Sequence, residues 1–184
     1  MKDLIFSKKR ILLLGSGELG KELVIESKRL GLEVIAIDRY EKAPAMQVAD
    51  YSRVIDMGDK NILKNVIKEF NPEYVVPEIE ALSIDALKEL EDEGFNIVPN
   101  ARTVEITMNR DKIRDLASRD LKIKTAKFDY IYEFDDLEKK ADKIGFPLLV
   151  KPLMSSSGKG QSLVKQKMIY KMPGNNPNQI LEER

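Results

Sequence analysis

The chain has 184 residues, with 31 Lys and Arg against 31 Asp and Glu, and it contains no His, no Cys and no Trp. At about 150 residues per domain, this length predicts one full domain and a smaller one. Without His or Cys the chain cannot build a Ser-His-Asp triad, a thiolate nucleophile, a disulfide framework or an ordinary zinc site. Any acid, base or phosphate ligand must therefore come from other side chains or from the backbone.

Charge and hydropathy exclude further classes of protein. Zero net charge argues against nucleic-acid binding that relies on a bulk positive field. No apolar run approaches the roughly 20 residues of a membrane span, and residues 1–10 lack the apolar stretch of a signal peptide. We therefore expect a cytoplasmic protein with neither nucleic acid nor a membrane as partner. Charged residues make up 34% of the chain and Lys well outnumbers Arg, which favours a heat-adapted source.

The first 100 residues alternate between short apolar runs and helical periodicity. The run at 10–14 ends at Gly15, as a buried parallel strand does, and helical spacing follows from Glu18 to Leu30. Further strands are expected at 33–38, 53–56, 74–76 and 96–98, and further helices at 61–70 and 81–93. This alternation predicts a doubly wound, Rossmann-like α/β domain with a parallel sheet over residues 1–100.

Residues 101–165 have a different rhythm, which is typical of an incomplete α+β unit. We expect helices at 109–118 and 135–144, and strands at 124–132, 147–152 and 162–165. Asn109 is expected to cap the first of these helices. Residues 166–184 are rich in Pro, Gly and Asn around Met172 to Gln179, and we expect a loop-like tail there.

A glycine loop lies between the first predicted strand and helix. Gly15-Ser16-Gly17-Glu18-Leu19-Gly20 matches G-x-G-x-x-G, and Asp38 ends the next strand. Such glycines permit a tight turn, and the helix N-terminus presents N–H groups to an anion. Three interpretations stay open: NAD or FAD binding, a turn that needs glycine for packing alone, and binding of another phosphate-bearing ligand. Glu18 is either a plain first-turn acid or a carboxylate that accepts hydrogen bonds from an amine or hydroxyl.

Two acids, Glu78 and Glu80, come directly after the predicted strand at 74–76. In open α/β sheets, ligands collect beyond the carboxyl ends of the strands. We therefore regard this pair as candidate ligand-binding carboxylates, with acids that merely begin the next helix as the alternative.

A second loop, rich in serine and glycine, follows the strand at 147–152. It reads Ser155-Ser156-Ser157-Gly158-Lys159-Gly160-Gln161. Its N–H groups and hydroxyls can fold over phosphate oxygens. Lys151 ends an apolar strand, where an ammonium group needs a negative partner, and Arg110 can supply a further cation. These features favour phosphate binding over a flexible hairpin loop with an incidental lysine.

Five motifs together resemble formate-dependent phosphoribosylglycinamide formyltransferase, an ATP-grasp enzyme of purine biosynthesis. They are residues 13–21, Asp38-Arg39-Tyr40 with 43–49, 76–81, 107–110 and the loop at 151–161. The resemblance runs from about Arg10 to Lys165. It implies a preATP-grasp domain over 1–100 followed by the first part of an ATP-grasp domain over 101–165.

The resemblance also implies roles for individual residues. Glycinamide ribonucleotide would be held by Glu18, Leu19 and Glu78. ATP would be held by Arg110, Lys151, Ser156, Ser157, Gly158, Lys159, Gly160 and Gln161. In the implied reaction ATP phosphorylates formate to formyl phosphate, whose carbonyl the substrate amine attacks. Such chemistry needs positive charge and positioning rather than His or Cys. The expected partners are glycinamide ribonucleotide, formate, ATP and a second copy of the chain in a homodimer.

The resemblance ends near Lys165. In members of this family the matching sequence continues beyond that point, and the carboxylates that bind Mg²⁺ lie in the continuation. We therefore expect no metal ligands in this chain, Mg²⁺ bound elsewhere, and no catalysis by a truncated chain of this kind alone. Three alternatives stay open. They are another ATP-grasp carboxylate–amine ligase such as carboxyaminoimidazole ribonucleotide synthetase, a non-catalytic binding fragment and, most remotely, an NAD-dependent oxidoreductase.

Overall fold

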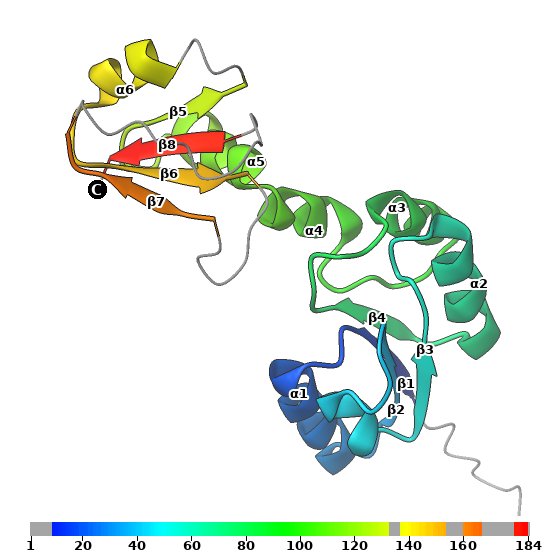
Figure 1. The fold of residues 1–184 in the computed structure, drawn as a ribbon. Coiled ribbons are helices and arrows are strands. Elements are labelled where there is room, and N and C mark those ends of the chain that lie inside the picture. The colour runs from blue at the N-terminus through cyan, green and yellow to red at the C-terminus, as the bar shows by residue number, and fades with distance from the viewer. Residues whose placement is uncertain (1–8, 133–136, 154–159, 167–178, 184) are drawn as a thin grey trace, which may run out of the picture. The chain divides into compact units, whose positions relative to one another are not determined.

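The computed structural model describes residues 9–132, 137–153, 160–166 and 179–183. The chain divides into two compact units, Met1–Glu105 and Ile106–Arg184, whose elements are labelled in Figure 1. Among the described residues, each helix is too short or too polar to span a membrane.

The first unit is built around a parallel sheet of four strands. The strands are β1 (Arg10–Leu14), β2 (Glu33–Asp38), β3 (Tyr51–Val54) and β4 (Tyr74–Pro77), in the order β3-β2-β1-β4. The connecting helices are α1 (Glu18–Arg29), the 3₁₀ helix η1 (Pro44–Gln47), α2 (Lys60–Phe70) and α3 (Ile84–Asp92), and α4 (Ala101–Met108) follows. All the strand pairings in this sheet are parallel, so the predicted doubly wound α/β fold is confirmed.

Helices cover both faces of this sheet, and the buried residues alternate between the faces as strand geometry requires. Toward α1 and η1 the core contains Leu13, Val24, Val34, Ala36 and Ala45. The opposite face, where α2 and α3 lie in Figure 1, carries the fully buried residues Leu12, Leu14, Ile35 and Ile37. Because both faces are buried, the strands have continuous apolar runs, which explains why β1 and β2 are evident from the sequence.

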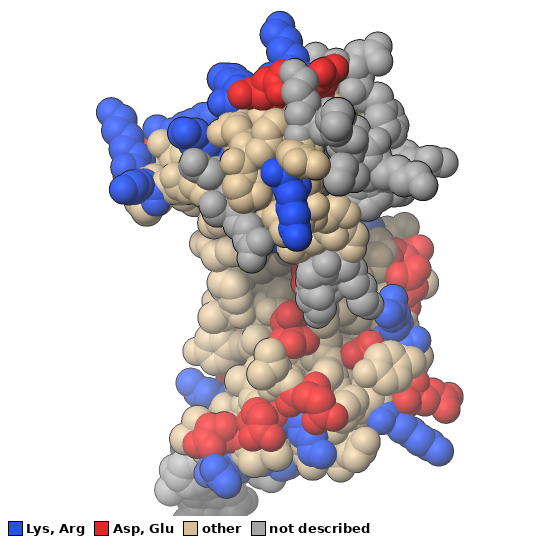
Figure 2. All heavy atoms as spheres, turned by 60° about the vertical axis from the view of Figure 1, so that its left-hand side comes forward, with Lys and Arg blue, Asp and Glu red and all other residues tan. Residues whose placement is uncertain are grey.

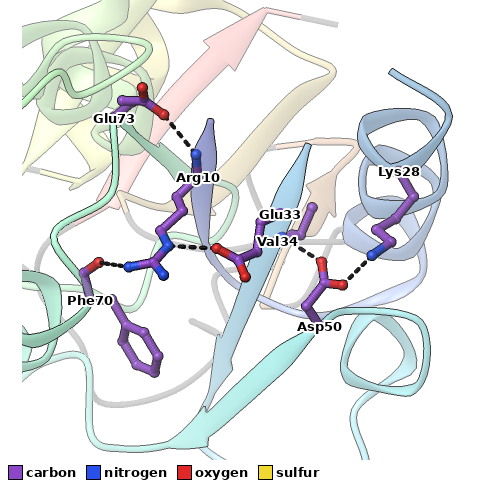
Figure 3. Close-up of polar contacts among 7 residues, drawn as sticks. All are labelled: Arg10, Lys28, Glu33, Val34, Asp50, Phe70 and Glu73. Carbon is purple, nitrogen blue, oxygen red and sulfur yellow. Dashed lines mark hydrogen bonds and ion pairs between the residues drawn. The ribbon is translucent and has the colours of Figure 1, made fainter. Parts of the chain in front are cut away.

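Arg10 links neighbouring segments at the amino-terminal end of the sheet through hydrogen bonds, as Figure 3 shows. Its backbone N–H donates to the Glu73 carboxylate at 2.7 Å, and its guanidinium donates to Glu33 and to the carbonyl oxygen of Phe70. These contacts tie β1 to β2 and to the segment that enters β4. The carboxyl ends of the strands lie at the opposite end of the sheet, where the loops of the first candidate site begin.

The second unit contains an antiparallel sheet. Its strands are β5 (Phe128–Ile131), β6 (Leu148–Pro152), β7 (Ser162–Val164) and β8 (Gln179–Glu183), in the order β5-β8-β6-β7. Helix α5 (Arg110–Asp115) continues into a π-helical turn over Leu116–Asp120. Helix α6 (Leu137–Ile144) packs on the sheet, and their shared core contains Ile131, Leu137, Ala141, Ile144, Leu148, Val150 and Leu181. The predicted α+β character of this unit is confirmed.

Several expected elements differ from the structure. The loop-like tail expected over 166–184 is wrong for residues 179–183, which form β8 between β5 and β6, with Ile180 and Leu181 buried. The strand expected over 124–132 begins only at Phe128. The strand expected at 96–98 is reduced to one parallel bridge between Val75 and Ile97. Asn109 occupies the cap position of α5 but makes no capping hydrogen bond through its side chain.

The zero net charge of the whole chain conceals opposite charges on its two units. Met1–Glu105 has 15 Lys and Arg against 20 Asp and Glu, whereas Ile106–Arg184 has 16 against 11. Figure 2 shows that acidic and basic side chains both occur on the visible face of each unit, so the difference is one of net charge and not of complete separation. Each unit therefore has a net charge of its own sign.

A network of ion pairs joins α2 to α3 on the surface of the first unit. Lys60 and Lys64 pair with Glu89, while Lys64 and Lys68 pair with Glu93. Hydrogen bonds from Lys60 and Lys64 lower the pKa of Glu89 to about 2. A carboxyl group with a depressed pKa in the folded state stabilises the fold above its unfolded pKa, and this contribution is lost as the pH falls toward the folded pKa.

We predict that the variant Glu89→Gln loses less thermal stability than the parent chain between about pH 5 and about pH 2. Melting curves followed by circular dichroism across this range provide the measurement. Glu26→Gln, which removes only an exposed pair with Arg29, is the control and should retain the acid sensitivity of the parent. Identical pH profiles for Glu89→Gln and the parent would contradict the prediction.

Candidate functional site

The first candidate site lies where the connections of the parallel sheet diverge. β1 and β4 are neighbours in the sheet, but the chain leaves β1 toward β2 and β3 and returns to β4 on the other side. Ligands of doubly wound sheets bind at such a switch point, beyond the carboxyl ends of the strands. The loop after β1, residues 15–17, and the acids after β4, Glu78 and Glu80, both follow strands that end here. The structure thus brings together two features that the sequence showed separately.

Gly15 and Glu78 are in close contact at this point. Gly15 has a φ of +108°, and a Cβ atom there would lie 2.5 Å from Ile79 Cγ2 and 2.7 Å from Glu78 Oε2. Both the backbone conformation and the available space therefore require glycine. The backbone N–H of Glu78 donates to the carbonyl oxygen of Leu14 at 2.8 Å. The Glu78 carboxylate consequently packs directly against the glycine loop.

The surroundings of Glu78 favour a ligand that brings a hydrogen-bond donor or a positive charge. Partial burial raises the pKa of Glu78, and the negative charges of Glu80 and Asp38 raise it further. A cationic or donor group placed beside Glu78 would relieve both effects. An amine is the simplest group with these properties.

Glu18 and Leu19 begin α1 next to the same loop. Both side chains are exposed, and Leu19 reaches 76% exposure although it is apolar. Gly17 caps α1 without any side-chain capping bond, and a Cβ atom on Gly17 would have no atom within 4 Å. An open helix N-terminus of this kind suits an anionic group, because its first N–H groups have no partner within the helix.

The second candidate site is a pocket of about 200 Å³ within the second unit. Its lining residues come from α5, the π-helical turn, the segment before β5 and the sheet; they are Arg110, Ile113, Arg114, Ala117, Thr125, Lys151 and Ile180. Partial burial lowers the pKa of Lys151, and the positive charges of Arg114 and Arg110 lower it further. Three cationic side chains around one pocket match the charge of a phosphate chain.

Arg114 was not identified from the sequence, although a signal for it exists. It follows Arg110 by four residues on α5, so the two side chains share one helix face. Its guanidinium lies over the ring of Phe128, 5.7 Å from the ring centre, which orients it on the pocket wall. Thr125 belongs to an irregular segment, and no periodicity in the sequence indicates that it lines the pocket.

The loop between β6 and β7 is described only at its ends. Val150 pairs with Ser162 in the antiparallel register, which places Gln161 level with Lys151. Gly160 has a φ of +73° and stands against Pro152. The predicted ATP-binding residues Ser156, Ser157, Gly158 and Lys159 lie outside the described residues. Within the described part of the chain, no group of three or more Asp, Glu, His or Cys side chains is placed to hold a metal ion.

Comparisons with known proteins agree with this architecture. Residues 8–108 match the ribonucleotide synthetase preATP-grasp domain family, and residues 116–179 match the ATP-grasp domain family. A formate-dependent phosphoribosylglycinamide formyltransferase from Prochlorococcus marinus (strain MIT 9301) is 94% identical over 167 residues, which cover 91% of this chain and 43% of the relative.

Two solved structures show the same fold. Glycinamide-RNase-transformylase T from Mycobacterium tuberculosis superposes with a TM-score of 0.80 at 38% identity, covering 96% of this chain and 48% of that protein. N5-carboxyaminoimidazole ribonucleotide synthetase from Thermotoga maritima gives a TM-score of 0.79 at 26% identity, covering 96% and 46%.

The chain belongs to the ribonucleotide synthetase preATP-grasp family. Within it, the predicted resemblance to formate-dependent phosphoribosylglycinamide formyltransferase is confirmed by the identity to the Prochlorococcus relative. The chain spans 43% of the length of that relative.

Two glycines of the first loop should respond differently to substitution. A Cβ atom at Gly20 would lie 2.9 Å from the carbonyl oxygen of Gly15 and 3.1 Å from Leu13 Cδ2. We predict that Gly20→Ala lowers the free energy of unfolding by about 1–3 kcal/mol, because α1 must move away from β1. Gly17→Ala has space for its Cβ atom and loses only N-cap preference, so it should lower the free energy of unfolding by less, under about 1 kcal/mol. Urea denaturation measures both, and equal losses in the two variants would contradict this packing.

Proposed function

We propose that these residues provide the glycinamide ribonucleotide site and part of the ATP site of an enzyme that transfers a formyl group from formate to the amine of that substrate. The observation that carries the proposal is the contact of the Glu78 carboxylate with the glycine loop, beside the open N-terminus of α1. An amine and a phosphate are the two charged groups of glycinamide ribonucleotide. A carboxylate next to free backbone donors is complementary to such a pair.

On the substrate side, we assign Glu18, Leu19 and Glu78 to glycinamide ribonucleotide. All three border one loop of the first unit, so a single ligand can contact them together. The two carboxylates suit the amine and the ribose hydroxyls, because ionised Glu only accepts hydrogen bonds. The exposed Leu19 side chain offers an apolar surface to the same ligand.

On the nucleotide side, we assign Arg110, Arg114 and Lys151 to the phosphates of ATP. The pocket that these residues line supports this assignment. Gly160 and Gln161 join them through the hairpin of β6 and β7. For Ser156, Ser157, Gly158 and Lys159 the assignment rests on the resemblance to the formyltransferases.

The proposed reaction has two steps, and the residues here position and neutralise its reactants. A formate oxygen attacks the γ-phosphorus of ATP, the bond to the ADP oxygen breaks, and formyl phosphate forms. The amine nitrogen then attacks the formyl carbon, phosphate leaves, and the nitrogen loses a proton. Positive side chains around the transferred phosphoryl group favour the first step.

Magnesium would normally share the neutralisation of the phosphates, but the described residues offer no carboxylate cluster for it. We propose that its ligands lie outside the described residues. The resemblance to the formyltransferases leads us to propose also that the 184 residues bind their ligands without turnover. Formylation that depends on ATP and formate, catalysed by the purified 184 residues, would overturn this part of the proposal.

The alternatives are less well supported. Carboxyaminoimidazole ribonucleotide synthetase shares the fold at 26% identity, whereas the relative that is 94% identical carries the formyltransferase name. An NAD-dependent oxidoreductase requires Asp38 to face a ribose, but both carboxylate oxygens of Asp38 accept backbone N–H groups of the chain itself. A homodimer remains part of the proposal.

The assignment of Glu78 predicts a specific pH dependence. We expect glycinamide ribonucleotide to bind the chain, and Glu78→Gln to weaken binding roughly tenfold or more. Because the pKa of Glu78 is raised, its carboxylate is lost at a higher pH than that of an ordinary glutamate. Binding should therefore weaken as the pH falls through this raised pKa. Isothermal titration calorimetry at a series of pH values tests this.

The control for this experiment is Glu80→Gln, which keeps Glu78 but removes one of the charges that raise its pKa. It should bind the ligand at neutral pH, with the midpoint of the pH profile moved to lower pH. Undiminished affinity in Glu78→Gln would exclude Glu78 from the substrate site.

The nucleotide pocket predicts that Arg114→Ala and Lys151→Met each weaken ATP binding roughly tenfold. Since the pKa of Lys151 is lowered, ATP affinity should fall as the pH rises through that lowered pKa, and Lys151→Arg should remove this fall. Arg119→Ala is the matched control, because Arg119 is exposed and pairs with Asp115. Calorimetry with ATP provides the measurement, and equal affinities of Arg114→Ala and Arg119→Ala would contradict the assignment.

A further inference from the structure

Asp38, at the carboxyl end of β2, is a buried acid that the proposed reaction leaves without a role. The residue is 5% exposed, and Ser16 in the glycine loop is fully buried. A carboxylate is costly to bury unless hydrogen bonds replace its lost water. The hydrogen bonds of Asp38 therefore show how the fold compensates for the burial of its charge.

Both carboxylate oxygens of Asp38 accept hydrogen bonds from the backbone. Oδ2 accepts the N–H of Ser16 at 2.7 Å, and Oδ1 accepts the N–H of Arg39 at 2.7 Å. Short bonds between an ionised acceptor and backbone N–H groups are among the stronger hydrogen bonds in proteins. The first of them reaches from β2 into the loop, between two of its glycines.

Further hydrogen bonds hold Ser16 and its neighbour Gly15 in place. Its hydroxyl donates to the carbonyl oxygen of Ile37 at 3.0 Å, and its own carbonyl oxygen accepts the N–H of Ala45 at 2.9 Å. The N–H of Gly15 also donates to the carbonyl oxygen of Ile37, at 3.0 Å. The N–H, the hydroxyl and the carbonyl oxygen of Ser16 are thus all hydrogen-bonded, and Asp38 supplies the one charged acceptor among these contacts.

We propose that Asp38 is a positioning residue of the substrate site: its carboxylate holds the loop at Ser16 so that Glu18, Leu19 and Glu78 are correctly arranged, and it does not contact the ligand. This inference rests on the proposed function. In dinucleotide-binding folds the acid at this place binds ribose hydroxyls. In this chain the acid at that position holds the loop instead, because its oxygens accept the backbone N–H groups of Ser16 and Arg39.

Asp38 also acts on Glu78 through its charge. Asp38 lies close enough to Glu78 for its charge to raise the pKa of that residue, together with burial and the charge of Glu80. Neutralising Asp38 while keeping its shape should therefore lower the pKa of Glu78. The pH at which glycinamide ribonucleotide binding is half lost should move down with it.

The test uses Asp38→Asn in the full 184-residue chain, because an amide keeps one acceptor oxygen and replaces the other with a donor. The matched control is Asp50→Asn. Asp50 also accepts a backbone N–H of β2, that of Val34 at 2.8 Å, but at the amino end of the strand, where it also pairs with Lys28 (Figure 3). Melting temperatures of both variants show how much general stability each substitution removes.

We expect Asp38→Asn to bind glycinamide ribonucleotide roughly ten- to a hundredfold more weakly than the parent, because small displacements of positioning groups have effects of this size. Asp50→Asn should bind like the parent. In the ligand-free chains, the Glu78 carboxyl signal in NMR spectra should titrate at lower pH in Asp38→Asn and be unchanged in Asp50→Asn. The Ser16 amide should exchange with solvent faster in Asp38→Asn.

Parent-like affinity of Asp38→Asn, or loss of affinity with an unchanged Ser16 amide and unchanged Glu78 titration, would overturn the inference. The second result would show direct contact between Asp38 and the ligand. If Asp38→Asn does not fold, the parent chain still decides: a Ser16 amide that exchanges as fast as those of Gly17 and Glu18 would refute the role. Failure of the parent to bind the substrate would instead refute the proposed function, while the ligand-free measurements would still test how Asp38 holds the loop.

Discussion

The first site depends on one close approach, in which the carboxylate of Glu78 lies against the backbone of Gly15 where no side chain fits. This contact exists because β1 and β4 are adjacent in the sheet, so that the loops after them leave from the same edge. The positive φ of Gly15 turns the chain toward Ser16, and the carboxylate of Asp38 accepts the Ser16 N–H. Strand order, glycine and buried acid together set the geometry around Glu78.

Much of this site is predictable from the sequence, because its parts depend on local patterns. A strand, a glycine turn and a helix can be recognised within the stretch from Arg10 to Leu30, and the rule that ligands bind beyond parallel strands points to Glu78. The orientation of Asp38 is different. An acid at the end of β2 is compatible both with a ribose ligand and with a loop contact, and only the three-dimensional position of Ser16 decides between them.

In the second unit, prediction fails where structure depends on distant partners. β8 has two apolar residues among polar ones, and a local pattern of that kind favours a loop. It forms a strand because its backbone pairs with β5 on one side and β6 on the other, while Ile180 and Leu181 enter the core. Pairing between segments far apart in sequence leaves no periodicity to detect. The pocket shows the same contrast. Helical spacing places Arg110 and Arg114 on one face of α5, whereas no local pattern indicates that Thr125 lines the pocket.

The division of charge between the units bears on how each handles phosphate. If the second unit binds ATP as proposed, its net positive charge attracts the nucleotide, and the three cationic side chains of the pocket hold the phosphates. The first unit is acidic, so a phosphoribosyl ligand gains nothing from its net charge. The proposed binding there would depend on backbone N–H groups at short range, since screening removes most of the field beyond about 8 Å. An acidic surrounding in turn favours a protonated amine. Neutrality of the whole chain, which argues against nucleic-acid binding, is therefore compatible with the two proposed phosphate sites, which differ in how they are built.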